Sequence, residues 1–121
     1  MSQLALIVED EASLRAIYQT VLNSLGFTVI EAGDGGEALS ILEETTPSVI
    51  FLDMLLPRVD GTRVLDYIQG SPYLQEIPVV VLTAHHRFQQ LIHLNANDLF
   101  LLKPVRPRDI HTAVQHVLAT L

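Results

Sequence analysis

The residues Val49-Ile50-Phe51-Leu52-Asp53 are four apolar side chains followed abruptly by a carboxylate. Pro47 and Pro57 lie on the two sides of this run, and its composition is typical of a strand buried on both faces of a sheet. An acid at the end of such a strand needs a reason. Asp53 either caps the loop that follows, or it has a chemical role that other carboxylates of the chain help to define.

Four further segments predict the other strands. Apolar runs occur at Leu4–Val8, Val79–Leu82 and Leu99–Leu102. The segment Phe27–Ala32 alternates apolar and polar residues loosely, as expected for a strand at the edge of a sheet.

Apolar side chains recur at helical spacing between these strands. The patterns cover residues 14–25, 38–42, 61–68, 88–92 and 110–121. Gly26 supplies a stop for the first helix, and Leu121 is the last apolar residue of the fifth. The fourth pattern is the weakest. Strand and helix thus alternate five times, which predicts a parallel sheet covered by helices on both faces.

The composition predicts one soluble domain over residues 1–121. The chain is 49% apolar, enough for one core. Its net charge of −7, without a basic cluster, disfavours direct binding to nucleic acid or to anionic lipid. The absence of cysteine excludes disulfides and thiolate metal sites. No signal peptide and no apolar run near ~20 residues is seen, so we expect a cytoplasmic protein without membrane contact.

Polar residues gather where the predicted strands end. These residues are Glu9, Asp10, Asp53, Thr83 and Lys103. Because ligands of open parallel sheets bind outside the carboxyl ends of the strands, we expect the five to share one rim. Three adjacent carboxylates repel one another unless a cation balances them, and Mg²⁺ prefers oxygen ligands while leaving room for a phosphoryl oxygen. The rim is therefore predicted to receive a phosphoryl group, with Asp53 as nucleophile.

At these motifs the chain resembles the response-regulator receiver domain of two-component signalling, from Leu4 to its last residue. The matching pieces are Ile7-Val8-Glu9-Asp10-Glu11, Leu52-Asp53-Met54-Leu55-Leu56-Pro57 with Asp60-Gly61, Leu82-Thr83-Ala84, and Phe100-Leu101-Leu102-Lys103-Pro104. The resemblance implies a flavodoxin-like, doubly wound α/β fold with five helices and a five-stranded parallel sheet in the order 2-1-3-4-5.

The resemblance also implies a metal site and a phospho-acceptor. Asp53 would accept a phosphoryl group from a histidine kinase or a histidine phosphotransfer protein. Asp10, Asp53 and the Leu55 carbonyl would bind Mg²⁺ directly, and Glu9 would act through a metal-bound water. The domain is then a signalling module rather than a classical enzyme, although it catalyses its own phosphorylation and slow dephosphorylation.

Two residues would hold the phosphoryl oxygens, and two would form a switch. The first pair is Thr83 and Lys103, and the second is Thr83 and Phe100. The switch would act on the face formed by the last two strands and the last two helices. The resemblance further implies a cis Lys103-Pro104 bond, a downstream effector protein or a fused domain absent from this chain, and a phosphorylation-dependent homodimer.

The chain departs from the family pattern between Thr83 and Lys103, where the spacing is short. We therefore expect the fourth helix to be short, shifted or partly unwound. Leu55 and His85 occupy the two positions near the acceptor that vary in the family, and we expect them to influence the lifetime of the phosphoryl group.

Two other functions compete with this interpretation. A flavin-binding carrier has the same strand order, but it needs a Ser/Thr/Gly-rich phosphate loop where this chain has Glu9-Asp10-Glu11. An aspartate-nucleophile phosphatase has an Asp-x-Asp motif, whereas in this chain Leu55 occupies the position of the second aspartate, two residues after Asp53.

Overall fold

The computed structural model describes residues 3–56 and 59–119, except for the side chain of residue 118. Strands and helices alternate five times along these ranges, as the sequence predicts. In chain order they are β1 (Gln3–Val8), α1 (Ala12–Ser24), β2 (Phe27–Ala32), α2 (Gly35–Glu44), β3 (Val49–Asp53), α3 (Gly61–Gly70), β4 (Val79–Thr83), α4 (Phe88–Leu91), β5 (Leu99–Leu102) and α5 (Pro107–Ala119). Pro57 and Leu121, which bound two of the predicted elements, lie outside the described residues.

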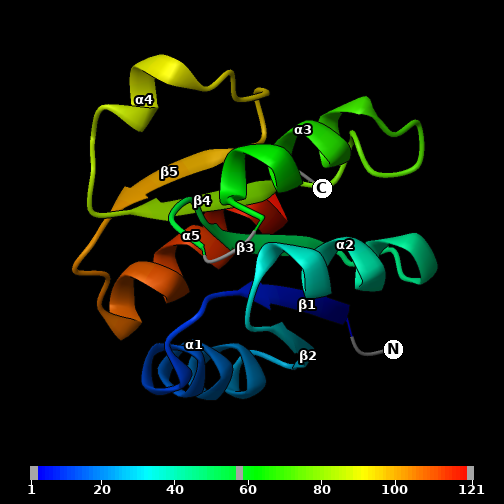
Figure 1. Ribbon diagram of the computed structural model, residues 1–121. Helices are drawn as coiled ribbons and strands as arrows, with labels where there is room; N and C mark the ends of the chain where they lie inside the picture. The colour runs from blue at the N-terminus through cyan, green and yellow to red at the C-terminus, as the bar shows by residue number, and fades with distance from the viewer. Residues whose placement is uncertain (1–2, 57–58, 120–121) are drawn as a thin grey trace.

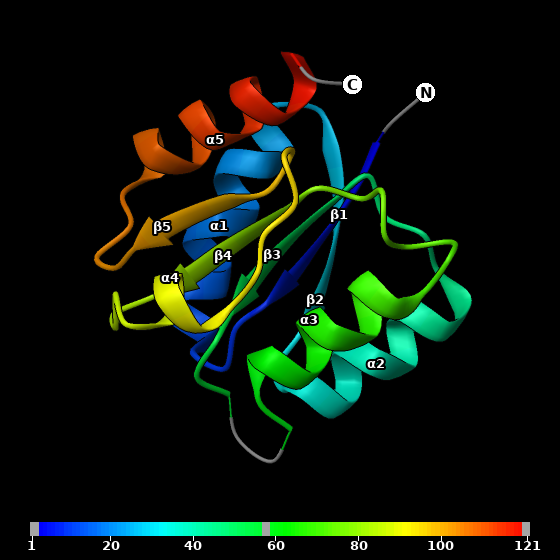
Figure 2. The same cartoon turned by 90° about the horizontal axis from the view of Figure 1, so that it is seen from above.

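The five strands form one parallel sheet in the order β2-β1-β3-β4-β5. This order confirms the predicted fold and puts the loosely alternating β2 at an edge (Figure 1). Helices α1 and α5 lie on one side of the sheet, and α2 and α3 lie on the other (Figure 2). β2 lies on one side of β1, and β3, β4 and β5 follow on the other side. The strand order therefore reverses at β1, and a ligand crevice is expected beyond the carboxyl ends of β1 and β3.

Each face of the sheet has its own apolar core. Ile50 and Leu52 of β3 pack with α2 and α3, whereas Val49 and Phe51 pack with α1 and α5. Every residue of β3 is buried, including Asp53 at its end. A strand covered on both faces needs apolar side chains at successive positions, which explains the unbroken run that the sequence shows.

Turn residues fix where three helices begin or end. Gly26 has a φ of 92°, the left-handed conformation that glycine adopts easily after a helix, and it follows α1 as predicted. The side chain of Asp34 caps α2 by accepting a hydrogen bond from the Glu37 N–H at 2.8 Å. Asp60 caps α3 through the N–H of Arg63 at 3.2 Å.

Helix α4 has only four residues, which confirms the prediction that the fourth helix is short. None of its residues is buried, and Leu91 is 71% exposed. Because so short a helix covers little of the sheet, β5 beside it has no fully buried residue. In the described part of the chain, no helix has the length and apolar character needed to cross a membrane.

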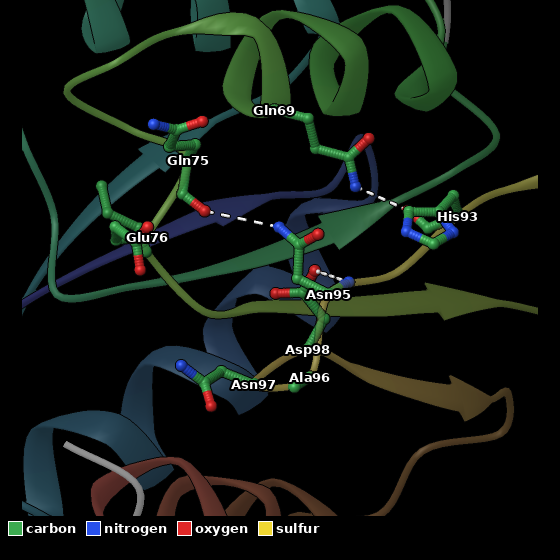
Figure 3. A pocket seen from close by; sticks show the side chains of 9 residues that line it. Gln69, Gln75, Glu76, His93, Asn95, Ala96, Asn97 and Asp98 are labelled. Atoms are coloured by element: carbon green, nitrogen blue, oxygen red, sulfur yellow. Dashed lines mark hydrogen bonds between the residues drawn. The ribbon is translucent and has the colours of Figure 1, made fainter.

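Hydrogen bonds fasten the connection from α4 to β5 against the rest of the domain (Figure 3). The Asp98 carboxylate accepts from the backbone N–H of Val79 at 2.8 Å and from that of Asn95 at 2.9 Å. Nε2 of Gln69, on α3, donates to the carbonyl oxygen of His93 at 2.6 Å. Polar contacts thus stabilise a segment that lacks a full helix.

Candidate functional site

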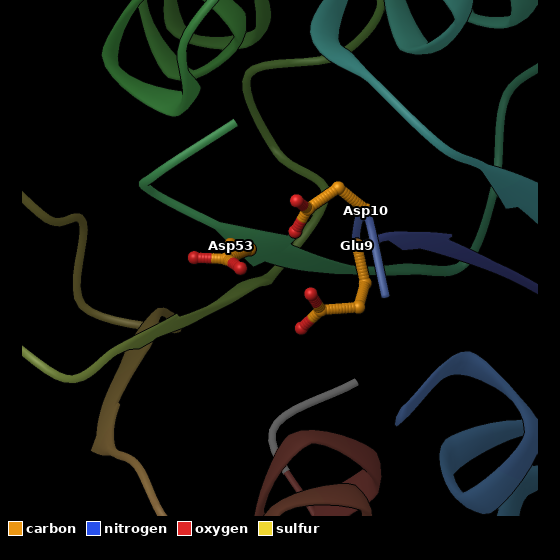
Figure 4. A group of neighbouring side chains, drawn as sticks. All are labelled: Glu9, Asp10 and Asp53. Atoms are coloured by element: carbon orange, nitrogen blue, oxygen red, sulfur yellow. The ribbon is translucent and has the colours of Figure 1, made fainter. Parts of the chain in front are cut away.

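Three carboxylates meet beyond the carboxyl ends of β1 and β3 (Figure 4). Asp53 is the last residue of β3, and Glu9 and Asp10 directly follow β1. Each acid offers one oxygen, and these three atoms lie within 4.8 Å of one another. Glu9 and Asp53 are buried, whereas Asp10 is exposed. The structure therefore brings together the three acids that the sequence places on one rim.

The ammonium of Lys103 lies between the two buried acids. Its Nζ donates to Oε1 of Glu9 and to Oδ2 of Asp53, each at 2.8 Å. Lys103 follows β5, and its backbone N–H donates to the Thr83 carbonyl oxygen at 2.8 Å, which continues the pairing of β4 with β5. The bond between Lys103 and Pro104 is cis, as predicted. A side chain from the edge of the sheet thus reaches the acids near its centre.

Burial and charge shift the pKa values of this group. Burial raises the pKa of Glu9 to about 7, although the hydrogen bond from Lys103 opposes the shift. For Lys103, burial alone would lower the pKa, but hydrogen bonds to Asp53 and Glu9 outweigh it and raise the pKa. The lysine therefore stays charged and partly balances the acids. A second cation would have to share the carboxylates with it.

The backbone after β3 is packed closely against Asp53. Oδ1 of Asp53 accepts a hydrogen bond from the Leu55 N–H at 3.0 Å, and the Leu55 side chain is 45% exposed. The N–H of Gly61 donates to the Met54 carbonyl oxygen at 3.0 Å. A Cβ on Gly61 would overlap the carbonyl oxygen of Asp53, so only glycine fits at this start of α3. The Asp60-Gly61 motif is thereby linked to the position of the acceptor.

Thr83 and Phe100 are the predicted switch residues. Thr83 lies at the carboxyl end of its strand, whereas Phe100 lies within its strand. Thr83 ends β4 on the rim, is buried, and accepts a hydrogen bond from the His85 N–H through Oγ1 at 3.2 Å. Phe100 lies opposite Val81 within β5, is partly buried, and packs against the core on the α2 and α3 side. The structure thus brings Thr83 to the acids' edge of the sheet but keeps Phe100 inside β5.

Arg15 is a contributor to the site that the sequence did not reveal. Its Nη1 donates to the carbonyl oxygens of Glu9 at 2.7 Å and Asp10 at 3.2 Å. Its Nε is 3.2 Å from Oε1 of Glu31 on β2. One sequence signal exists, because Arg15 lies in the first turn of α1, where the helix dipole disfavours a cation. Such a residue needs a partner elsewhere, and here the partners are the carbonyls of the acidic loop.

Comparison with known proteins adds an independent line of support. The model of the response regulator receiver domain matches residues 5–115. The chain is 33% identical over 120 residues to the alkaline phosphatase synthesis transcriptional regulatory protein PhoP of Bacillus subtilis (strain 168), and the match covers 98% of this chain and 49% of that protein. The chain spans about half the length of the curated relatives it matches.

Solved structures give the same result. The signal receiver domain of a signal transduction histidine kinase from Syntrophus aciditrophicus has a TM-score of 0.88 at 28% identity, covering 99% of this chain and 92% of that chain. The receiver domain of a sensor histidine kinase from Pseudomonas aeruginosa PAO1, solved with a magnesium ion coordinated in its active site cleft, has a TM-score of 0.86 at 26% identity and covers 98% and 99%. On the motifs, the fold and these matches, the chain belongs to the response regulator receiver domain family of two-component systems.

Proposed function

We propose that this chain is a single phospho-accepting receiver domain over residues 1–121, in which Asp53 takes a phosphoryl group from a histidine kinase or a histidine phosphotransfer protein. The observation that carries the proposal is the Asp53 carboxylate, buried beside two further acids and held by the Lys103 ammonium at 2.8 Å. A carboxylate in this setting is held in position by a neighbouring cation, as a nucleophile requires.

The reaction transfers one phosphoryl group. An oxygen of Asp53 forms a bond to phosphorus as the bond from phosphorus to the donor's imidazole nitrogen breaks, and the electron pair of the broken bond returns to that nitrogen. The product is an acyl phosphate on Asp53 and a free histidine on the donor. No side-chain base is needed on this chain, because phosphoryl transfer to a carboxylate depends on positioning and charge neutralisation.

The donor atoms at the rim fit Mg²⁺, a hard cation that prefers oxygen ligands. Asp10 and Asp53 would bind it directly together with the Leu55 carbonyl, and Glu9 would bind through a water. When bound, the ion neutralises and orients the phosphoryl oxygens. Because Asp10 is exposed, one side of the acidic group is open to solvent. This agrees with a metal ion that binds reversibly from solution.

Thr83 and Lys103 hold the phosphoryl oxygens in this proposal. Lys103 already contacts Asp53, so a short movement of its ammonium reaches a phosphoryl oxygen. The Thr83 hydroxyl is engaged by the N–H of His85, and its turn toward the phosphoryl group would release that N–H. Because His85 lies just before α4, this exchange would alter the segment that links β4 to β5.

The output follows from that movement. Thr83 and Phe100 form the switch, and the surface of β4, α4, β5 and α5 presents its result to an effector protein or a fused domain. Phe100 packs beside the same core as Phe88 of α4, which couples the strand to the short helix. A homodimer formed on phosphorylation is a further part of the proposal, and the cytoplasmic location stays a prediction.

The phosphoryl group leaves slowly when water attacks it, which makes the domain its own phosphatase. Leu55 and His85 are the residues that we expect to control this rate.

The competing functions find less support at the rim. Glu9 and Asp10 follow β1, where a flavin carrier would need phosphate-binding N–H donors instead of acids.

The proposal is tested by intact mass spectrometry after incubation with Mg²⁺ and acetyl phosphate. We expect the mass of one phosphoryl group to be added, and we expect no addition with EDTA or in Asp53→Asn. The matched control is Asp66→Asn, because Asp66 is an exposed acid on α3. Equal labelling of the Asp53 variant and the Asp66 variant would refute the assignment.

A further inference from the structure

Tyr18 on α1 buries a hydroxyl that the core does not require. The side chain is 1% exposed and packs on the α1 and α5 side of the sheet. Among the described residues, its hydroxyl is the one buried side-chain polar atom without a hydrogen-bond partner. Burying an unpaired hydroxyl costs free energy, and phenylalanine would fill the same space without that cost. The oxygen therefore calls for a role outside core packing.

The surroundings of this hydroxyl connect it to Lys103. Tyr18 and Lys103 line the same hollow of ≈330 Å³, whose remaining lining is apolar. The other lining residues are Leu14, Ala84, Pro104 and Val105. Burial raises the pKa of Tyr18 to about 12, and the charges of Lys103 and Glu9 act on it in opposite directions. The hydroxyl thus stays protonated near neutral pH, within the electrostatic field of the site.

Lys103 has one donor more than its two acidic partners use. An ammonium carries three N–H donors, and the structure pairs Nζ with Glu9 and Asp53. In the proposed function both partners would change, because Asp53 would become an acyl phosphate and Glu9 would help to hold the metal. A further acceptor would then help to keep the ammonium directed at the phosphoryl oxygens.

We propose that Tyr18 is a positioning residue for Lys103, and that its hydroxyl oxygen accepts a hydrogen bond from Lys103 Nζ when Asp53 carries the phosphoryl group. This inference rests on the proposed function and deepens it. Tyr18 lines the hollow beside Lys103, and the side chains of the other lining residues offer no hydrogen-bond acceptor. The contact forms only in the phosphorylated state, so it favours that state over the resting one.

The test compares Tyr18→Phe with Tyr73→Phe, a control whose side chain is 83% exposed. Isothermal titration measures the affinity of each chain for beryllofluoride, which mimics the phosphoryl group, in the presence of Mg²⁺. We expect Tyr18→Phe to bind about tenfold more weakly than the wild type, because one charge-assisted hydrogen bond is lost. The control should bind as the wild type does, and the metal-free stability of Tyr18→Phe should be equal to or above that of the wild type.

A second measurement uses the fact that Lys103 is the only lysine of the chain. ¹⁵N-lysine labelling gives a single Nζ signal, which should differ between the wild type and Tyr18→Phe in the beryllofluoride complex and coincide without beryllofluoride. A crystal structure of the wild-type complex should place Tyr18 Oη at about 3 Å from Lys103 Nζ, which needs no variant.

The outcomes separate this inference from the function on which it rests. Wild-type affinity and an unchanged Nζ signal in Tyr18→Phe, with the wild-type chain binding beryllofluoride, would overturn the role of Tyr18 alone. An equal loss of stability with and without beryllofluoride would assign Tyr18 to core packing and also overturn it. Failure of the wild type itself to bind beryllofluoride would overturn the proposed function and the inference together.

Discussion

The ammonium of Lys103 lies 2.8 Å from Oε1 of Glu9, although 94 residues separate the two in the chain. The same nitrogen contacts Asp53, so the chain supplies its own cation to a cluster of acids. A dication at the rim must compete with that lysine for the carboxylates. The carboxylates can therefore form either an internal ion pair with Lys103 or a metal complex.

Lys103→Met should tighten Mg²⁺ binding several-fold while it slows phosphorylation by acetyl phosphate at least tenfold. The metal gains carboxylates that the lysine no longer occupies, but the phosphoryl oxygens lose a positive partner. Without metal at pH 8, the variant should lose on the order of 3 kcal/mol of stability, because two buried acids are left unpaired. Titration calorimetry and urea unfolding measure these effects. Unchanged Mg²⁺ affinity would argue against competition.

The metal-free protein should lose stability as the pH rises, because Glu9 loses its proton in the folded state. Its pKa is about 7 in the folded chain and 4.5 ordinarily, so the folded state binds the extra proton between these values. The stabilisation is complete below about pH 4.5 and is lost as the pH rises through 7. Glu9→Gln, which imitates the protonated acid, should equal the wild type near pH 4.5 and exceed it by roughly 2 to 3 kcal/mol at pH 8. A difference that stays constant with pH in EDTA would contradict this.

Gly61→Ala should damage the site through the backbone. The new Cβ would overlap the Asp53 carbonyl oxygen, so the acceptor strand or the start of α3 must move. We expect a loss of about 1 to 3 kcal/mol in thermal or urea unfolding, together with slower phosphorylation. Gly70→Ala is the matched control on the same helix, because a Cβ there meets no atom within 4 Å. Equal behaviour of the two variants would show that the close approach has no influence.

Arg15→Gln should weaken Mg²⁺ binding several-fold, although Arg15 provides no metal ligand. Its guanidinium holds the carbonyls of Glu9 and Asp10, and its loss frees the loop that carries both acids. The control is Arg106→Gln, which removes an exposed pair with Asp109 at 3.7 Å and should have little effect. Calorimetric titration with Mg²⁺ distinguishes the two. A wild-type affinity in Arg15→Gln would mean that the loop keeps its shape unaided.

The sequence predicts the fold and most residues of the candidate site, because the apolar runs of its strands end abruptly in polar residues. Apolar runs that stop at Asp53 or Lys103 mark both the strand and its functional end, and the parallel order then gathers the ends on one rim. The short spacing between Thr83 and Lys103 likewise predicts a fourth helix that is short, shifted or partly unwound. The roles of Arg15 and Tyr18 lie beyond such reasoning, since a helical pattern shows neither which loop carbonyls a guanidinium reaches nor which buried hydroxyl lacks a partner. Both depend on how side chains and loops lie in the folded chain, which periodicity along the sequence does not record.

Chemical trapping determines whether Asp53 is the residue that carries the phosphoryl group. Borohydride reduces an acyl phosphate of aspartate to homoserine, which peptide mass spectrometry locates in the chain. After incubation with Mg²⁺ and a phosphorylated histidine kinase or acetyl phosphate, we predict homoserine at position 53 alone, and none when EDTA is present. Homoserine at another position, or an unmodified residue 53 in a chain that has gained a phosphoryl group, would contradict the claim.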